Sequence, residues 1–294
     1  MTLKQGSKRG ISYGVKAASC AFVAAGLFWT ASPAQAQTTF DVIGPKEYDL
    51  PVDFDPFNVF VQYAYVQNND HVWDVNGNKV AGDGSQSIVG LSKFVHFWTP
   101  SFSNKIGLAY EVIQPEIAIR NRGAADPDGR HVSGFGDTLT GFATWYKPTP
   151  ESTLGIQSFL QIPWGDKDVS DTNWKNLTSL LWYTPLIGKF DWTGDAGFVW
   201  QSTKDNGLKP GTTFHTNNRF GYQMLDWLEP YIALDYEHTD SYSNVPKSWG
   251  LDGGLGVMVS YAESSSLAVR YSKSLNGENH AYNDSWNLRY IYAW

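Results

Sequence analysis

The last ten residues of the chain place a large apolar side chain at every second position. These side chains belong to Trp286, Leu288, Tyr290, Tyr292 and Trp294. A period of two is typical of a β-strand, and one face of this strand is apolar throughout. Such a strand would promote aggregation at a solvated sheet edge, but it is stable where it closes a barrel with its apolar face in lipid. The pattern therefore predicts that residues 285–294 close a transmembrane β-barrel.

The same alternation recurs along residues 57–294, which we expect to form an all-β, antiparallel, up-and-down barrel of about twelve strands. Aromatic residues make up 15% of the chain and its mean hydropathy is −0.34, as expected when half of the strand residues face lipid and half face water. Short and long connections also alternate. A soluble β-sandwich is the alternative, but Tyr and Trp recur near the strand ends, as they do in membrane girdles.

The first 36 residues have the features of a secretory signal peptide. A basic region containing Lys4 and Lys16 precedes an apolar run, and Ala34-Gln35-Ala36 forms a small-x-small cleavage site. Residues 37–56 are polar, acidic and rich in proline, and we expect them to form either a periplasmic N-terminal segment or a short plug. Secretion together with a barrel predicts the outer membrane of a Gram-negative-type bacterium.

Cleavage of the leader would leave 18 basic and 29 acidic residues, a net charge of −11, which argues against nucleic acid as a partner. The only cysteine, Cys20, lies in the leader. Carboxylates at residues 74–78 and 126–129 do not complete a calcium-loop spacing, and no glycine-rich cofactor loop precedes a helix. We expect neither metal nor cofactor. The expected partners are outer-membrane lipid, the barrel-assembly machinery during biogenesis, and a small-molecule solute.

Charged residues on the inward phase of the strands are candidates for a lumen constriction. They are Glu111, Asp195, Arg219, Asp235, Asp252, Arg270 and Arg289. Charges within a membrane protein are costly unless they face water or one another, so this belt predicts either a polar channel with a transverse field or a closed interior whose charges satisfy each other. The predicted apolar lining is Phe60, Phe142 and Phe159. Lys93 falls on an apolar face, which indicates a bulge or an inward-pointing face.

No enzyme is predicted. His96 and His238 lie at strand ends and His215 points inward, and none of the three belongs to a local serine-containing motif. A lone histidine is a weak catalytic signal.

Two short glycine-containing motifs carry a family resemblance. The first is Gly134-x-Gly136-Asp137 before an alternating strand, and the second is Pro163-x-Gly165-Asp166 after a strand. The chain resembles, from about Val89 to its end, the meta-pathway phenol-degradation family of outer-membrane, transporter-like β-barrel proteins. The glycines of the first motif are expected to permit a bulge that turns Asp137 away from lipid.

The resemblance implies a channel for passive uptake or efflux of small solutes, with aromatic or other apolar compounds favoured. The alternative is a closed barrel with a structural or partner-binding role through its external loops. The resemblance supplies no functional residues.

Overall fold

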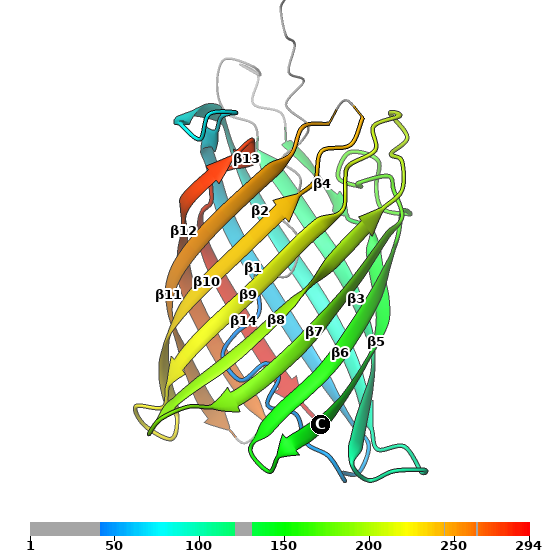
Figure 1. Ribbon diagram of the computed structural model, residues 1–294, viewed down its shortest axis with the longest axis vertical. Helices are drawn as coiled ribbons and strands as arrows, with labels where there is room; N and C mark the ends of the chain where they lie inside the picture. Colours follow the sequence, from blue (N-terminus) through cyan, green and yellow to red (C-terminus); the bar gives the residue numbers. More distant parts are fainter. Residues whose placement is uncertain (1–41, 121–130, 244, 263) are drawn as a thin grey trace, which may run out of the picture. The chain divides into compact units, whose positions relative to one another are not determined.

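The computed structural model describes residues 42–120, 131–243, 245–262 and 264–294 (Figure 1). The predicted signal peptide and the carboxylate loop at residues 126–129 lie outside these ranges. Among the described residues, no helix has the length and apolar content needed to cross a membrane.

Within the ranges that the structure describes, twelve long antiparallel strands form one closed sheet, as predicted, and two short strands extend it. The long strands are β1 (Phe57–Trp73), β2 (Lys79–Trp98), β3 (Ile106–Arg120), β5 (Thr138–Thr149), β6 (Ser152–Ile162), β7 (Lys175–Pro185), β8 (Phe190–Gln201), β9 (Thr213–Tyr222), β10 (Leu228–Thr239), β11 (Ser248–Ala262), β12 (Ser265–Glu278) and β14 (Asp284–Ala293). The short strand β4 (His131–Phe135) pairs with β3, and β13 (His280–Ala281) pairs with β1. Each long strand pairs with the next along the chain, and the strands are tilted (Figure 1).

The last strand closes the barrel, as its alternation predicts. Residues 59–67 of β1 pair with residues 285–293 of β14, and the backbone groups of Asn58 and Trp294 exchange hydrogen bonds of 2.9 and 3.0 Å. Trp286, Tyr292 and Trp294 are exposed on the outer surface, while Arg289 is buried inside. An apolar outer face and a polar inner face are what a lipid-embedded barrel strand requires.

The predicted phase of two strands is wrong. Val61, Tyr63 and Tyr65 of β1 point into the barrel, so Phe60 lies on the outer wall. Both faces of β1 carry apolar side chains, so alternation alone could not say which face meets lipid. Val61, Tyr63 and Tyr65 belong to one hydrophobic cluster inside the barrel. Val42, which precedes the first strand, packs against that cluster and covers them.

The second error concerns the alternating strand after Gly134-x-Gly136-Asp137, which was expected to direct Phe142 into the lumen. The chain leaves the sheet at Gly136 and Asp137, so that β4 and β5 are separate strands and the alternation restarts. Leu139 and Trp145 therefore face inward, whereas Phe142 is 61% exposed on the outer wall. Phe159 is buried inside the barrel, as predicted.

Lys93 lies on an inward-pointing face, which is one of the two alternatives that its position allowed. The pairing of β2 with β1 and with β3 continues through Lys93 without a bulge. Its ammonium group lies 2.7 Å from the carboxylate of Glu111 on β3. A buried cation is tolerated here because an acid lies beside it.

Candidate functional site

All seven charged candidates for the lumen are buried inside the barrel. They lie on β3 (Glu111), β8 (Asp195), β9 (Arg219), β10 (Asp235), β11 (Asp252), β12 (Arg270) and β14 (Arg289). Six of them come from the half of the wall formed by β8 to β14. The opposite half, β1 to β7, presents a cluster of apolar side chains to the interior, including Leu91, Leu139, Phe159 and Leu177.

Asp235 brings two of the predicted arginines together. Its Oδ1 accepts a hydrogen bond from Arg219 Nη1 at 2.5 Å, and its Oδ2 accepts one from Arg270 Nη1 at 3.1 Å. Arg270 must cross β11 to reach Asp235, and it does so past Gly254, where an added Cβ would lie 3.1 Å from the Arg270 Cδ. The acidic and basic residues are thus paired across strands and do not form two separate arcs of charge.

The remaining predicted acids have separate partners. Glu111 pairs with Lys93, as described above. Asp252 accepts hydrogen bonds from Ser274 Oγ at 2.6 Å and Asn283 Nδ2 at 2.9 Å. Since these groups lie on different parts of the wall, the seven residues form several local clusters and not one ring.

Residues 42–56, which we call the N-terminal segment, run inside the strand wall (Figure 1, blue) and supply partners that the sequence did not reveal. Glu47 accepts hydrogen bonds from Arg289 and, at 2.6 Å, from Tyr63 Oη. The carbonyl oxygen of Ile43 accepts a bond of 2.7 Å from Arg219 Nε. Charge-assisted bonds of this kind are stronger than neutral ones, so these contacts hold the segment firmly in the lumen.

The end of the N-terminal segment nearer β1 packs on the apolar half of the wall. Trp145 Nε1 donates to the carbonyl oxygen of Pro51 at 2.7 Å, and the Trp145 ring stacks on Phe54 with centroids 6.3 Å apart. Leu50, Val52 and Phe54 pack against a buried cluster that contains Trp145. The segment therefore matches the wall: charged and polar contacts on one side, apolar contacts on the other.

A chain of polar contacts links the segment to three buried wall residues. Tyr48 Oη donates to Asp195 Oδ2 at 3.0 Å, Asp195 Oδ1 lies 3.3 Å from His215 Nδ1, and His215 Nε2 lies 3.1 Å from Ser179 Oγ. Ser179 reaches across β8 past Gly197, where a Cβ would lie 2.5 Å from the serine oxygen. His215 was predicted to point inward, but its serine neighbour comes from another strand and could not be found by a local motif.

The two family-like motifs lie against each other. Gly165 N donates to Asp137 Oδ1 at 3.0 Å, and Phe135 N donates to Asp166 Oδ2 at 2.7 Å, so the aspartate of each motif accepts a bond from the backbone of the other. A Cβ at Gly165 would lie 2.7 Å from the backbone of Gly136, which explains why a glycine is needed there. Asp137 is buried and turned away from lipid, at an interruption between β4 and β5.

Asp171, in the loop between β6 and β7 that also contains Gly165 and Asp166, is held ionised. Asp171 lies 2.5 Å from Lys175 Nζ and 3.3 Å from Lys204 Nζ. Burial acts to raise the pKa of Asp171, but the two ammonium groups outweigh burial and lower the pKa to about 2. The pair with Lys204 ties the loop after β6 to the loop after β8, and the pair with Lys175 ties the same loop to the start of β7.

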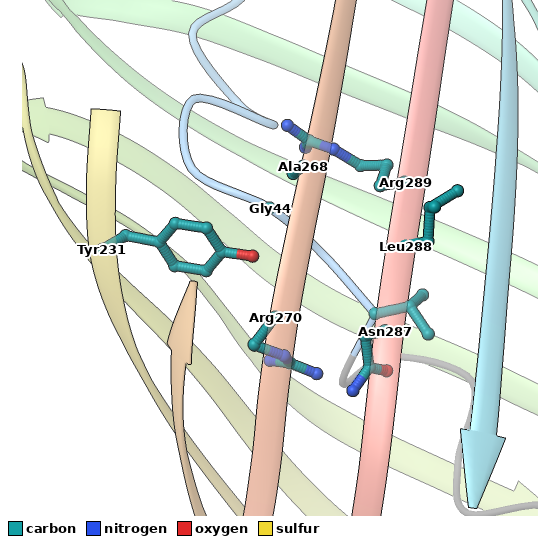
Figure 2. A pocket seen from close by; sticks show the side chains of 8 residues that line it. Gly44, Tyr231, Ala268, Arg270, Asn287, Leu288 and Arg289 are labelled. Atoms are coloured by element: carbon teal, nitrogen blue, oxygen red, sulfur yellow. The ribbon is translucent and has the colours of Figure 1, made fainter. Parts of the chain in front are cut away.

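A small, partly open pocket lies between the N-terminal segment and the polar half of the wall (Figure 2). It is lined by Val42, Gly44, Tyr231, Ala268, Arg270, Asn287, Leu288 and Arg289. Figure 2 shows the hydroxyl of Tyr231 directed into the space between the arginines. Two buried polar atoms of the lining, Arg289 Nε and Asn287 Oδ1, have no hydrogen-bond partner.

Metal ligation finds no support in the described ranges, where no three His, Cys, Asp or Glu side chains are grouped to hold an ion. In the turn at residues 74–78, Asp74 Oδ1 accepts hydrogen bonds of 2.8 Å from the backbone N–H groups of Asn76 and Asn78. That is ordinary turn chemistry.

Similar structures are outer-membrane β-barrels. An outer membrane channel from Pseudomonas putida F1 aligns with a TM-score of 0.74 and 18% identity, over 86% of this chain and 100% of that one. The β domain of the Bordetella autotransporter BrkA aligns with a TM-score of 0.51 and 13% identity, over 82% and 100% of the two chains. At these identities the likeness shows a shared fold, that of a closed barrel located in the bacterial outer membrane.

A comparison with curated proteins finds no match. A family model, by contrast, matches residues 69–290, which is most of the chain and includes both glycine-containing motifs. The chain therefore belongs to the family described as "Putative MetA-pathway of phenol degradation".

Proposed function

We propose that the protein is an outer-membrane channel for the passive movement of small solutes, among them aromatic and other apolar compounds, and that the N-terminal segment must shift to open it. The observation that carries this proposal is the way the segment is held. Its recorded contacts with the wall are side-chain hydrogen bonds, ion pairs and apolar packing, and it does not join the sheet. A segment held in this way can leave without unfolding the barrel.

The division of the lumen favours amphipathic solutes. One half of the wall is mostly apolar apart from the Lys93–Glu111 ion pair, and the other carries arginines, carboxylates and amides. A molecule with a ring and a polar group can contact both halves at once, as the N-terminal segment itself does. Binding sites for small molecules are in general mostly apolar with a few placed polar groups. The family description, which names phenol degradation, agrees with this class of solute.

The proposed role is not enzymatic. Ser, His and Asp form catalytic triads elsewhere, and Ser179, His215 and Asp195 have the connectivity of one. All three are buried, however, and Asp195 also binds Tyr48 of the N-terminal segment and Asn217. We assign this group the role of holding the segment.

Uptake by intact cells tests the proposal. Cells that carry the protein should accumulate radiolabelled phenol faster than cells that lack it, and a variant without residues 42–56 should accelerate uptake further. Equal uptake by all three strains would refute the channel.

A closed barrel with a structural or partner-binding role is the second candidate. The observation that favours it is the mutual pairing of the buried charges, such as Asp235 with Arg219 and Arg270, which a sealed interior also needs. This candidate predicts that external loops bind a partner, and that deleting a loop abolishes that binding while solute uptake stays at the level of cells without the protein.

A further inference from the structure

The cavity beside the N-terminal segment contains an arginine that is only partly satisfied. Arg289 is buried, and it donates through Nη1 to the carboxylate of Glu47 and through Nη2, at 3.2 Å, to the carbonyl oxygen of Pro45. Its Nε has no hydrogen-bond partner, and the Arg289 residue is part of the cavity lining. A guanidinium group presents its donors as a planar fork that suits a carboxylate, so this side of the fork is available to an anion.

The neighbouring side chains complete an anion site. Arg270 and the hydroxyl of Tyr231 also face the cavity (Figure 2). The remaining lining combines Val42, Gly44, Ala268 and Leu288 with the side-chain amide of Asn287. The chemistry of the site thus fits a negatively charged group attached to a small apolar body.

Glu47 already shows how such a group is bound. Its carboxylate occupies Nη1 of Arg289, and Gly44 lies so close to the same guanidinium that a Cβ there would overlap it. Glu47 is the only acid recorded within ion-pair distance of Arg289 among the described residues. Any other carboxylate that reaches Arg289 must therefore compete with the segment.

We propose that Arg289, with Arg270 and Tyr231, forms a binding site for the carboxylate of a small aromatic acid, and that this solute displaces Glu47 and with it the N-terminal segment. The inference rests on the proposed channel function and names one class of solute for it. Arg289 then favours an anionic solute over a neutral one of the same shape, and binding of such a solute promotes release of the segment without being required for the passage of neutral solutes.

Calorimetric titration of the full-length mature protein in detergent micelles tests the site, with benzoate as the probe and benzamide as a neutral molecule of the same shape. Loss of a charge-assisted hydrogen bond lowers affinity by about tenfold or more, so benzoate should bind at least that much more tightly than benzamide. Arg289→Gln should abolish the preference. Glu47→Gln, which removes the competing charge and leaves Arg289 intact, should tighten benzoate binding by about tenfold or more.

The two variants act in opposite directions, so poor folding of one cannot imitate the expected pattern. Lys209→Gln, in the loop after β8, should bind benzoate as the unaltered protein does. Equal affinity for benzoate and benzamide, or unchanged benzoate binding in both Arg289→Gln and Glu47→Gln, would overturn the site. Binding in micelles requires no transport, so its failure alone leaves the channel standing, whereas absent phenol uptake with intact benzoate binding would overturn only the channel.

Discussion

Replacing Glu47 by Gln is expected to release the N-terminal segment from the lumen more often. Glu47 and Arg289 are both buried, with 7% and 4% of their side-chain surfaces exposed. Gln keeps the shape of the side chain but has no charge. It also has one acceptor oxygen in place of the two carboxylate oxygens that accept from Arg289 and Tyr63. A hydrogen bond to a charged group contributes about 1.5–3 kcal/mol, which corresponds to about a 10- to 150-fold shift in the equilibrium between seated and released segment.

Single-channel recording in planar bilayers measures this shift as the fraction of time that the channel is open. As long as the segment is mostly seated, the open fraction of Glu47→Gln should rise by the same factor. Glu116→Gln is a matched control, because Glu116 is a carboxylate of the outer wall that accepts a hydrogen bond of 2.6 Å from Ser92 and does not contact the segment. An open fraction in Glu47→Gln equal to that of the unaltered protein would refute the view that this ion pair holds the lumen closed.

Three further outcomes follow from other parts of the structure. Asp137→Asn should destabilise the loop after β6 by about 1–3 kcal/mol, because Asp137 accepts from three donors of that loop and from Gln161 at the end of β6, and limited proteolysis should cut residues 163–174 faster; unchanged cleavage would contradict the role of the paired motifs. Asp171 has a folded pKa of about 2, below the ordinary value of about 4, so its stabilising contribution of at most about 2 kcal/mol should be present above pH 4 and lost as the pH falls through about 2. Urea unfolding at several pH values should show this loss, and Asp171→Asn should remove it; the same acid dependence in both proteins would exclude Asp171 as its origin. Trp286→Lys should lower the free energy of unfolding in lipid vesicles by up to about 4 kcal/mol, while Trp286→Phe should change it little, and equal stability of the two would argue against a lipid-facing β14.

Much of the barrel could be predicted from alternation alone. In β14 the outward aromatic residues and the inward Arg289 leave one assignment, because an arginine cannot face lipid cheaply. The same reasoning placed Asp195 and Arg219 inside the barrel.

Alternation misassigned two strands. One has no charged residue to mark its inward face, and the other follows an interruption of the sheet. On β1 both faces are apolar, and the inward Tyr63 is covered by a segment without periodic pattern. At Asp137 the interruption of the sheet resets the phase, so Phe142 could not be placed by continuing the alternation from residues before the interruption.

The contacts of the candidate site lay beyond the sequence for a related reason. Inward direction is a property of one strand, but the pairing of Arg270 with Asp235 depends on the register of three strands and on Gly254 in the middle one. The partner of Arg289 comes from Glu47, which is 242 residues away in the chain. Side-chain contacts of this range follow from tertiary structure and not from local pattern.

The central claim is that a wet lumen is closed by the N-terminal segment, and bilayer conductance of two proteins tests it most directly. One is the full mature chain and the other lacks residues 42–56 but keeps the barrel from Phe57 onward. We predict brief, rare openings for the first and a large, steady conductance for the second. The same conductance in both proteins would contradict the account.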